Sequence, residues 1–166
     1  VMSLSRLQNE FNESDYEADV FEFAVGNLTI HSDLAAITWP NTKEIRTSVN
    51  ALHNRILKNG GYLTISEGIH EITVILEEKE FKAARGAVSE KPIATHQNVG
   101  SVGVTFKKNY LDTPGLLYLI FQQLYLQNIN IIEIASTANQ LIVYLAEDNV
   151  RLAFETIYNR FVRKVK

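Results

Sequence analysis

The sequence contains no cysteine, which excludes disulfides, thiol catalysis and thiolate metal sites. A chain without cysteine suits a reducing compartment, and we expect a cytoplasmic protein. No run of eighteen apolar residues occurs, so we expect no membrane-spanning helix. The first twenty residues are acidic and lack the apolar core of a signal peptide.

An excess of positive charge is also missing. The chain has 16 Lys and Arg against 19 Asp and Glu, a formal net charge of −3. This balance provides no general attraction to nucleic acid or anionic lipid, so we expect neither as a partner. The basic tail from Arg160 to Lys166 suits the C-terminal end of a helix, and no nucleic-acid-reading motif accompanies it.

Catalytic and metal-binding patterns are absent as well. The histidines lack the short spacings of a metal site; they are His31, His53, His70 and His96. No Ser-His-Asp order, nucleophile elbow or pair of carboxylates in a plausible cleft is recognisable. The glycine pairs are not followed by the Gly-Lys-Ser/Thr of a phosphate loop. We therefore expect no catalytic residue, no metal and no cofactor, and a protein that is not an enzyme.

What the sequence does contain is a clear succession of periodic segments after residue 101. Period-two alternation predicts strands at 102–106 and 141–145, and β-branched residues predict a strand at 131–135. Helical spacing predicts helices at 115–127 and 148–161. Thr113 and Pro114 are typical of a helix start. The order is strand, helix, strand, strand, helix.

The preceding segment, residues 28–95, repeats that order. Strand-like stretches lie at 28–30 and 34–39, and a helix is predicted at 44–58, with Asn41 and Glu44 spaced as a capping box. Strands are predicted at 62–65 and 69–76 and a short helix at 77–86, and we expect residues 92–98 to form a connecting strand. Leu4, Leu7 and Phe11 also suggest an N-terminal helical segment, residues 1–26.

Three motifs in this order resemble an ACT domain: Asp112-Thr113-Pro114-Gly115, Asn128-Ile129-Asn130-Ile131 and Ser136-Thr137. The chain is most similar to the tandem ACT regulatory region of aspartate kinases, without the kinase domain. Gly68–Val74 resembles the corresponding strand of their first unit. Two departures are Gln127, where the family often has Gly, and Trp39–Thr42, which lacks the Pro-Gly pair.

The resemblance implies an α+β fold of two ferredoxin-like βαββαβ units with antiparallel sheets. The N-terminal helical segment (1–26) would precede a first ACT-like unit (27–97) and a second ACT unit (98–166). The family relationship further implies a non-catalytic regulatory module that binds a small molecule, an amino acid, at the interface of paired units.

The expected ligand-binding residues surround the predicted helix start: Asp112, Thr113, Pro114, Gly115, Leu116, Asn130 and Ile131. A helix N-terminus offers free amide groups and partial positive charge that suit a carboxylate, and Gly115 allows close approach of a ligand. The ACT fold implies that Asn130 and Ile131 lie beside the same helix end. The charge of Asp112 is wrong for a carboxylate, so it would face solvent or the ligand's ammonium group.

Other interpretations remain open. Exposed sheet edges favour pairing with another chain, and Ile131, Ile132 and Ile134 place apolar side chains on both faces of one strand, so we expect a homodimer. The alternative function is a ligand-free ACT-fold assembly or dimerisation domain, in which Thr113–Gly115 merely caps the helix. A third is an enzyme on the same fold, because fold does not determine function.

Overall fold

The computed structural model describes residues 25–107 and 115–162. The described chain repeats the order strand, helix, strand, strand, helix. The first series is β1 (Val25–Pro40), α3 (Lys43–Lys58), β2 (Leu63–Glu67), β3 (Glu71–Glu77) and α4 (Phe81–Ala87). The second is β4 (Ala94–Phe106), α5 (Leu116–Leu126), β5 (Ile131–Ser136), β6 (Gln140–Ala146) and α6 (Val150–Ile157). Short 3₁₀ turns, Glu78–Glu80 and Glu147–Asn149, precede α4 and α6, and a π-helical turn, Tyr158–Val162, follows α6.

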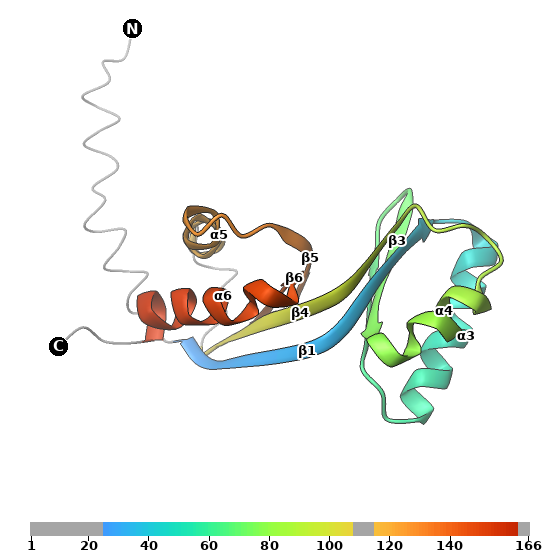
Figure 1. Cartoon of the computed structure of the whole chain (residues 1–166), viewed down its shortest axis with the longest axis horizontal. Helices are drawn as coiled ribbons and strands as arrows, with labels where there is room; N and C mark the ends of the chain where they lie inside the picture. Colours follow the sequence, from blue (N-terminus) through green and yellow to red (C-terminus); the bar gives the residue numbers. More distant parts are fainter. Residues whose placement is uncertain (1–24, 108–114, 163–166) are drawn as a thin grey trace, which may run out of the picture.

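The strands form one six-stranded antiparallel sheet in the order β2-β3-β1-β4-β6-β5. β1 and β4 are its long central strands and lie side by side (Figure 1). The second half of β1 pairs with β3, whereas the second half of β4 pairs with β6. β2 and β5 are therefore the edges of the sheet.

Both central strands carry a bulge near the middle. The β1–β4 register shifts between His31 and Leu34, and again between Leu34 and Ala36. Asp33 (φ 55°) and Asn98 (φ 52°) adopt left-handed backbone there, which Asp and Asn tolerate better than most residues. Because a bulge inserts one residue, it changes the phase of the alternation between the two faces of the sheet.

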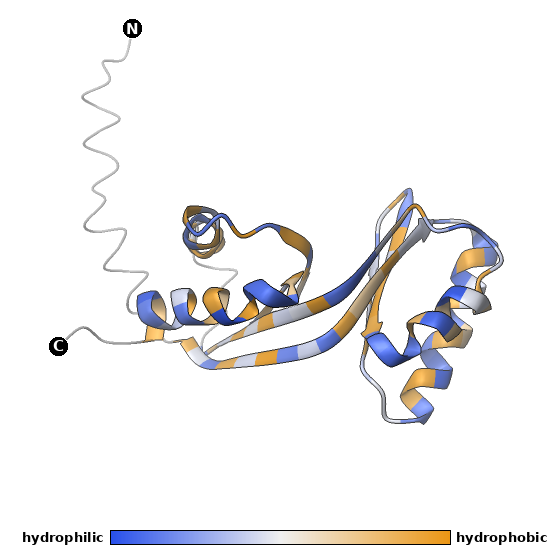
Figure 2. Ribbon diagram, in the orientation of Figure 1, coloured by the Kyte–Doolittle hydropathy of each residue, from blue (hydrophilic) through white to orange (hydrophobic). Residues whose placement is uncertain are grey.

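The four α-helices of the described chain cover one face of the sheet in two pairs. α3 and α4 pack at the β3 end, and α5 and α6 at the β6 end (Figure 1). Each pair has its own core because each helix buries one apolar stripe. Figure 2 shows the mixture of apolar and polar residues along these helices. The buried helical residues are Ile45, Val49, Leu52, Ile56 and Ala84 in the first core, and Leu116, Ile120, Leu124, Val150, Ala153 and Ile157 in the second.

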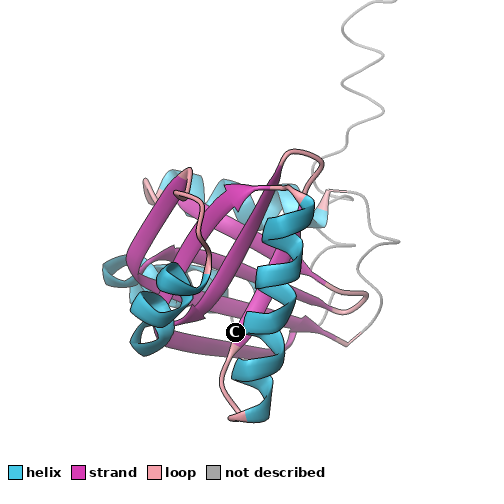
Figure 3. Cartoon of the chain, turned by 90° about the vertical axis from the view of Figure 1, so that its right-hand side faces the viewer, coloured by secondary structure: helices cyan, strands magenta, loops and turns pink. Residues whose placement is uncertain are grey.

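The opposite face of the sheet curls inward around a third apolar cluster. Leu34, Ile75, Val99 and Tyr144 of this cluster come from four different strands. Adjacent strands lie about 4.8 Å apart, so a flat sheet would hold β2 and β6 about 19 Å apart. Instead, the hydroxyl of Tyr62, next to β2, lies 2.5 Å from that of Tyr144 in β6. The end-on view in Figure 3 shows strands of one end running across those of the other.

The α+β class predicted from the sequence is confirmed, with two differences in how the strands are organised. The predicted strands 28–30 and 34–39 are one strand, β1, and the segments 92–98 and 102–106 are one strand, β4. The structure consequently has one continuous sheet, and the predicted division at residue 97 falls inside β4. The predicted helical segment 1–26 lies outside the described residues, except for Val25 and Gly26, which begin β1.

Candidate ligand site

The start of α5 has no side-chain cap in the described part of the chain. Its N-cap residue is Gly115, which has a left-handed φ of 82°. The carbonyl of Gly115 accepts the first helical hydrogen bond from the Leu119 amide at 3.0 Å. Leu116 is buried and anchors this turn in the second core. The other predicted ligand residues of this turn, Asp112, Thr113 and Pro114, lie outside the described residues.

Asn130 and Ile131 lie at the other end of α5. The 11 residues of this helix span about 16 Å at 1.5 Å per residue, and a four-residue connection leads from its C-terminal end to β5. The sheet register agrees, because Ile131 pairs with Leu145, far from Ser136, which pairs with Leu141. The expectation that Asn130 lies beside the N-terminal end of this helix is therefore wrong within one chain.

The left-handed backbone of Gly115 limits the substitutions that this position accepts. A β-branched residue such as Val is strongly disfavoured at positive φ. A Gly115→Val variant would therefore strain the helix start, so it cannot serve as a test that obstructs a ligand and leaves the fold unchanged. Asn130 is exposed, so its side chain is a better position for a substitution that tests ligand binding.

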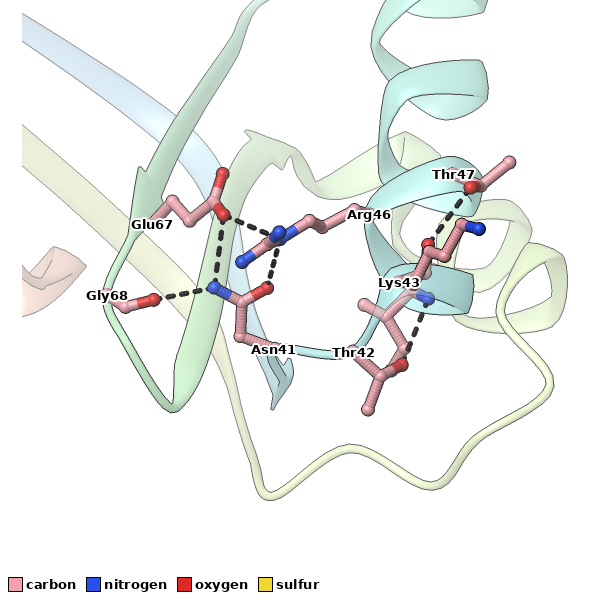
Figure 4. Close-up of polar contacts among 8 residues, drawn as sticks. Asn41, Thr42, Lys43, Arg46, Thr47, Glu67 and Gly68 are labelled. Atoms are coloured by element: carbon pink, nitrogen blue, oxygen red, sulfur yellow. Dashed lines mark hydrogen bonds and ion pairs between the residues drawn. The ribbon is translucent and has the colours of Figure 1, made fainter.

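The corresponding start of α3 is filled by the chain's own side chains (Figure 4). Thr42 is the N-cap, and its hydroxyl accepts a hydrogen bond from the Ile45 amide at 3.3 Å. The capping residue is thus Thr42, not Asn41 as the spacing suggested. The sequence signal was ambiguous because Asn and Thr are both good N-cap residues and stand next to each other.

Asn41 instead joins the helix start to the turn between β2 and β3. Its side-chain amide donates to Glu67 Oε1 at 3.1 Å and to the Gly68 carbonyl at 2.6 Å. Arg46 Nε donates to Asn41 Oδ1 and to Glu67 Oε1, both at 2.7 Å. Figure 4 shows the three side chains converging between α3 and the turn. The polar groups at this helix start therefore bind one another.

An apolar surface lies on α5 and the edge strand β5. The sequence of α5, LLYLIFQQLYL, has no charged residue. Ile134 pairs with Val143, whose side chain lies in the second core, so Ile134 shares the face that α5 covers. The exposed apolar side chains, hereafter the α5–β5 surface, are Tyr118, Tyr125, Leu126 and Ile134. Such a surface beside a sheet edge is typical of a contact with another chain.

Three hydroxyl groups connect the two ends of the sheet on its inner face. Tyr144 Oη lies within hydrogen-bond distance of Tyr62 Oη (2.5 Å) and Thr64 Oγ1 (3.1 Å), and Thr64 Oγ1 donates to Tyr62 Oη at 3.2 Å. Tyr144 is fully buried, and this burial raises its pKa well above the ordinary value of 10.0. No local sequence signal predicts this cluster, because Tyr62 and Tyr144 are 82 residues apart.

The described ranges, 25–107 and 115–162, contain neither a metal-binding cluster nor a membrane-spanning helix. No group of three His, Cys, Asp or Glu side chains in these ranges could hold a metal ion. No helix within them is both long enough and apolar enough to cross a membrane.

Solved structures show what this arrangement resembles. The ligand-free regulatory subunit of aspartate kinase from Thermus thermophilus superposes with a TM-score of 0.69 at 18% identity, and the match covers 84% of this chain and 99% of that one. Aspartate kinase from Clostridium acetobutylicum gives a TM-score of 0.67 at 18% identity, covering 83% of this chain and 35% of that one. Aspartokinase III from E. coli, in complex with lysine and aspartate, gives 0.62 at 8% identity, covering 84% and 33%.

No family model matches the sequence, and no curated protein matches it. The similarity to solved structures includes nearly the whole Thermus subunit but only about a third of each complete kinase. The sequence-based resemblance to the regulatory region of aspartate kinases, without the kinase domain, is confirmed at the level of the fold.

Proposed function

We propose that this chain is a non-catalytic regulatory module that binds an amino acid between two copies of itself. The fold shared with regulatory subunits of aspartate kinase supports a regulatory role. The complex of E. coli aspartokinase III with lysine and aspartate supports an amino acid as the ligand. The observation that carries the proposal is that no side chain of the described residues caps the start of α5.

The start of α5 provides a partner for a ligand carboxylate. The first amide groups of a helix have no carbonyl partner within it, and the helix dipole adds partial positive charge. No side chain of the described residues caps α5, in contrast to α3. Gly115 leaves room for close approach because it has no side chain. Asp112, Thr113 and Pro114 complete this proposed site on the strength of the sequence.

A second copy would bring Asn130 and Ile131 to this helix start. α5 begins after β4 ends at Phe106 and runs to the start of β5 at Ile131. Antiparallel pairing of two β5 strands about a two-fold axis places the first residue of one strand beside the last residue of the other. The partner's Asn130 and Ile131 would then lie at the end of the sheet where α5 starts.

The α5–β5 surface supports this pairing. It combines an edge strand with exposed Tyr118, Tyr125, Leu126 and Ile134, and burying these side chains stabilises a dimer through the hydrophobic effect. Tyrosine is enriched in protein interfaces. We expect a homodimer that buries roughly 1,200 Å² or more of total surface, the size of a stable specific interface.

The test is thermal unfolding with each of the twenty amino acids at millimolar concentration. A ligand at about 100 times its dissociation constant stabilises a protein by about 2.7 kcal/mol, which raises the Tm by several degrees. Asn130→Ala should abolish this shift, because we place its side chain amide at the ligand. Asn50→Ala makes the same chemical change at an exposed position of α3 and should retain the shift.

The alternative is an assembly domain that pairs through the α5–β5 surface and binds no ligand. The closed polar network at the start of α3 favours it, since one of the two helix starts has its polar groups already engaged. A dimer in sedimentation with no stabilisation by any amino acid would support this alternative and reject the sensing function. A monomer that is stabilised by an amino acid would reject the shared site.

A further inference from the structure

A concave surface between α4 and the segment leading into β4 is separate from the α5 start. Its volume is about 390 Å³, within the range of about 300–1,000 Å³ that is usual for small-molecule sites. One wall comes from Phe81 and Arg85, which lie one turn apart on α4 and therefore share a face. The other comes from Lys91, Pro92 and Ile93.

The charges that line this pocket have one sign. Arg85 and Lys91 are its two charged residues, and no carboxylate lines it. Four other basic residues of the described chain form ion pairs with Glu: Arg46, Arg55, Lys79 and Arg151. Within the described residues Arg85 and Lys91 form no such pair. Two cations without a counter-ion in a concave site favour an anionic ligand.

The same pocket has an apolar, fixed wall. Ile93 is 54% exposed and lines the pocket with Phe81 and Pro92, so it leaves apolar surface in contact with water. The Ile93 amide donates to the Thr38 carbonyl of β1 at 2.8 Å, which attaches this segment to the sheet. Pro92 restricts the backbone just before it. The wall is therefore already ordered before a ligand binds, so binding avoids the entropic cost of ordering it.

We propose that this pocket binds a small carboxylate with an apolar body of a few carbon atoms. Arg85 and Lys91 hold the carboxylate, and Phe81, Pro92 and Ile93 cover the apolar part. A free inorganic anion would use the cations but leave the apolar wall exposed. A neutral apolar molecule would use the wall but leave the cations without a partner.

Amide NMR spectra of the full chain, titrated with hexanoate, test this assignment. We expect saturable shifts at Ile93, Ala94 and Thr95, with a millimolar dissociation constant. Arg85→Gln and Lys91→Gln should each weaken hexanoate by about fivefold, as expected for a solvent-accessible ion pair. Lys82→Gln, on the same helix but outside the pocket, should leave the affinity unchanged.

Two further probes separate the contributions of charge and apolar contact. Hexan-1-ol and inorganic phosphate should each shift these amides more weakly than hexanoate. Equal shifts with hexan-1-ol would show that the cations have no role, and equal shifts with phosphate would show that the apolar wall has none. Either result, or no shift with hexanoate at tens of millimolar, overturns the proposal.

Discussion

The two edges of the sheet are built by the same order of elements but differ in surface chemistry. At the β2 edge, α3 carries five charged residues, Lys43, Glu44, Arg46, Arg55 and Lys58, and an internal network closes its start. At the β5 edge, α5 has no charged residue, and no side chain of the described residues caps it. Charged side chains on α3 oppose burial of its surface against another chain, whereas the uncharged α5 can be buried more readily. This difference supports the proposed contact at the β5 edge over one at the β2 edge.

The largest loss of stability is expected from truncating a buried side chain in either core. Leu52 in α3 and Leu124 in α5 are both buried, and replacing a buried Leu with Ala costs about 2–5 kcal/mol. Because β1 and β4 extend through both ends of the sheet, we expect each variant to unfold the whole chain in one transition. Urea unfolding, monitored by hydrogen exchange of backbone amides at both ends of the sheet, would measure this. Two separate transitions would show that the edges belong to independent units.

The sequence did not predict that β1 and β4 are long, continuous strands. The helices and the shorter strands were predicted because each keeps one period, as in the buried stripe Ile45, Val49, Leu52 and Ile56. In β1 the bulge at Asp33 changes the phase, so the buried alternation Ala35, Ile37 and Trp39 reads as a separate strand. Joining the two stretches requires the partner strand β4, which has its own bulge at Asn98 and starts more than fifty residues after β1 ends.

At the candidate site, the sequence predicted the start of the helix but not the position of Asn130, for a related reason. The helix start at Gly115 has a local signal, Thr-Pro-Gly, and the structure places a helix start there. Whether Asn130 lies beside that helix start depends on helix length and strand direction, and the 11 residues of α5 separate the two. The motif alone cannot distinguish a neighbour in the same chain from one in a second copy.

The next largest effect concerns the β5 edge. Ile134→Lys places a charge on the α5–β5 surface, and burying an unpaired charge in an interface costs about 2 kcal/mol or more. We expect the dimer dissociation constant to rise about thirtyfold or more, measured by sedimentation over a concentration series. Leu57→Lys is the matched control, because Leu57 is an exposed apolar residue of α3, near the other edge. An equal loss of dimer in both variants would contradict the assigned difference between the edges.

A smaller effect is expected where the two ends meet on the inner face. Tyr144→Phe removes a buried hydroxyl that bonds with Tyr62 and Thr64, so it should cost about 1–2 kcal/mol at neutral pH. The pKa of Tyr144 is raised by burial, so the wild-type chain prefers the neutral phenol. Its stabilisation is complete below pH 10 and declines as the pH rises above 10 toward the raised pKa.

This pH dependence separates the hydroxyl from the packing of the ring. The Tm of the wild-type chain should fall between pH 9 and 11 more than that of the Tyr144→Phe variant. Tyr118→Phe is the control, because Tyr118 is exposed and its hydroxyl accepts from Gln122 in the same helix. If the Tm of the Tyr144→Phe variant falls as much as that of the wild-type chain between pH 9 and 11, Tyr144 does not cause this decline.

The smallest effects distinguish the two helix starts themselves. Thr42→Ala removes the capping hydroxyl of α3 and should cost about 1 kcal/mol, whereas Thr42→Ser keeps the hydroxyl and should cost little. At α5 the roles differ, because Gly115 contributes its left-handed backbone and no cap. Gly115→Ala should cost about 1–2 kcal/mol, and Gly115→Asn less, since Asn tolerates this conformation. Chemical denaturation of the four variants measures both series. If Gly115→Ala does not lower the free energy of unfolding more than Gly115→Asn does, the start of α5 is independent of the left-handed backbone. In that case the two helix starts differ only in the polar network at Asn41.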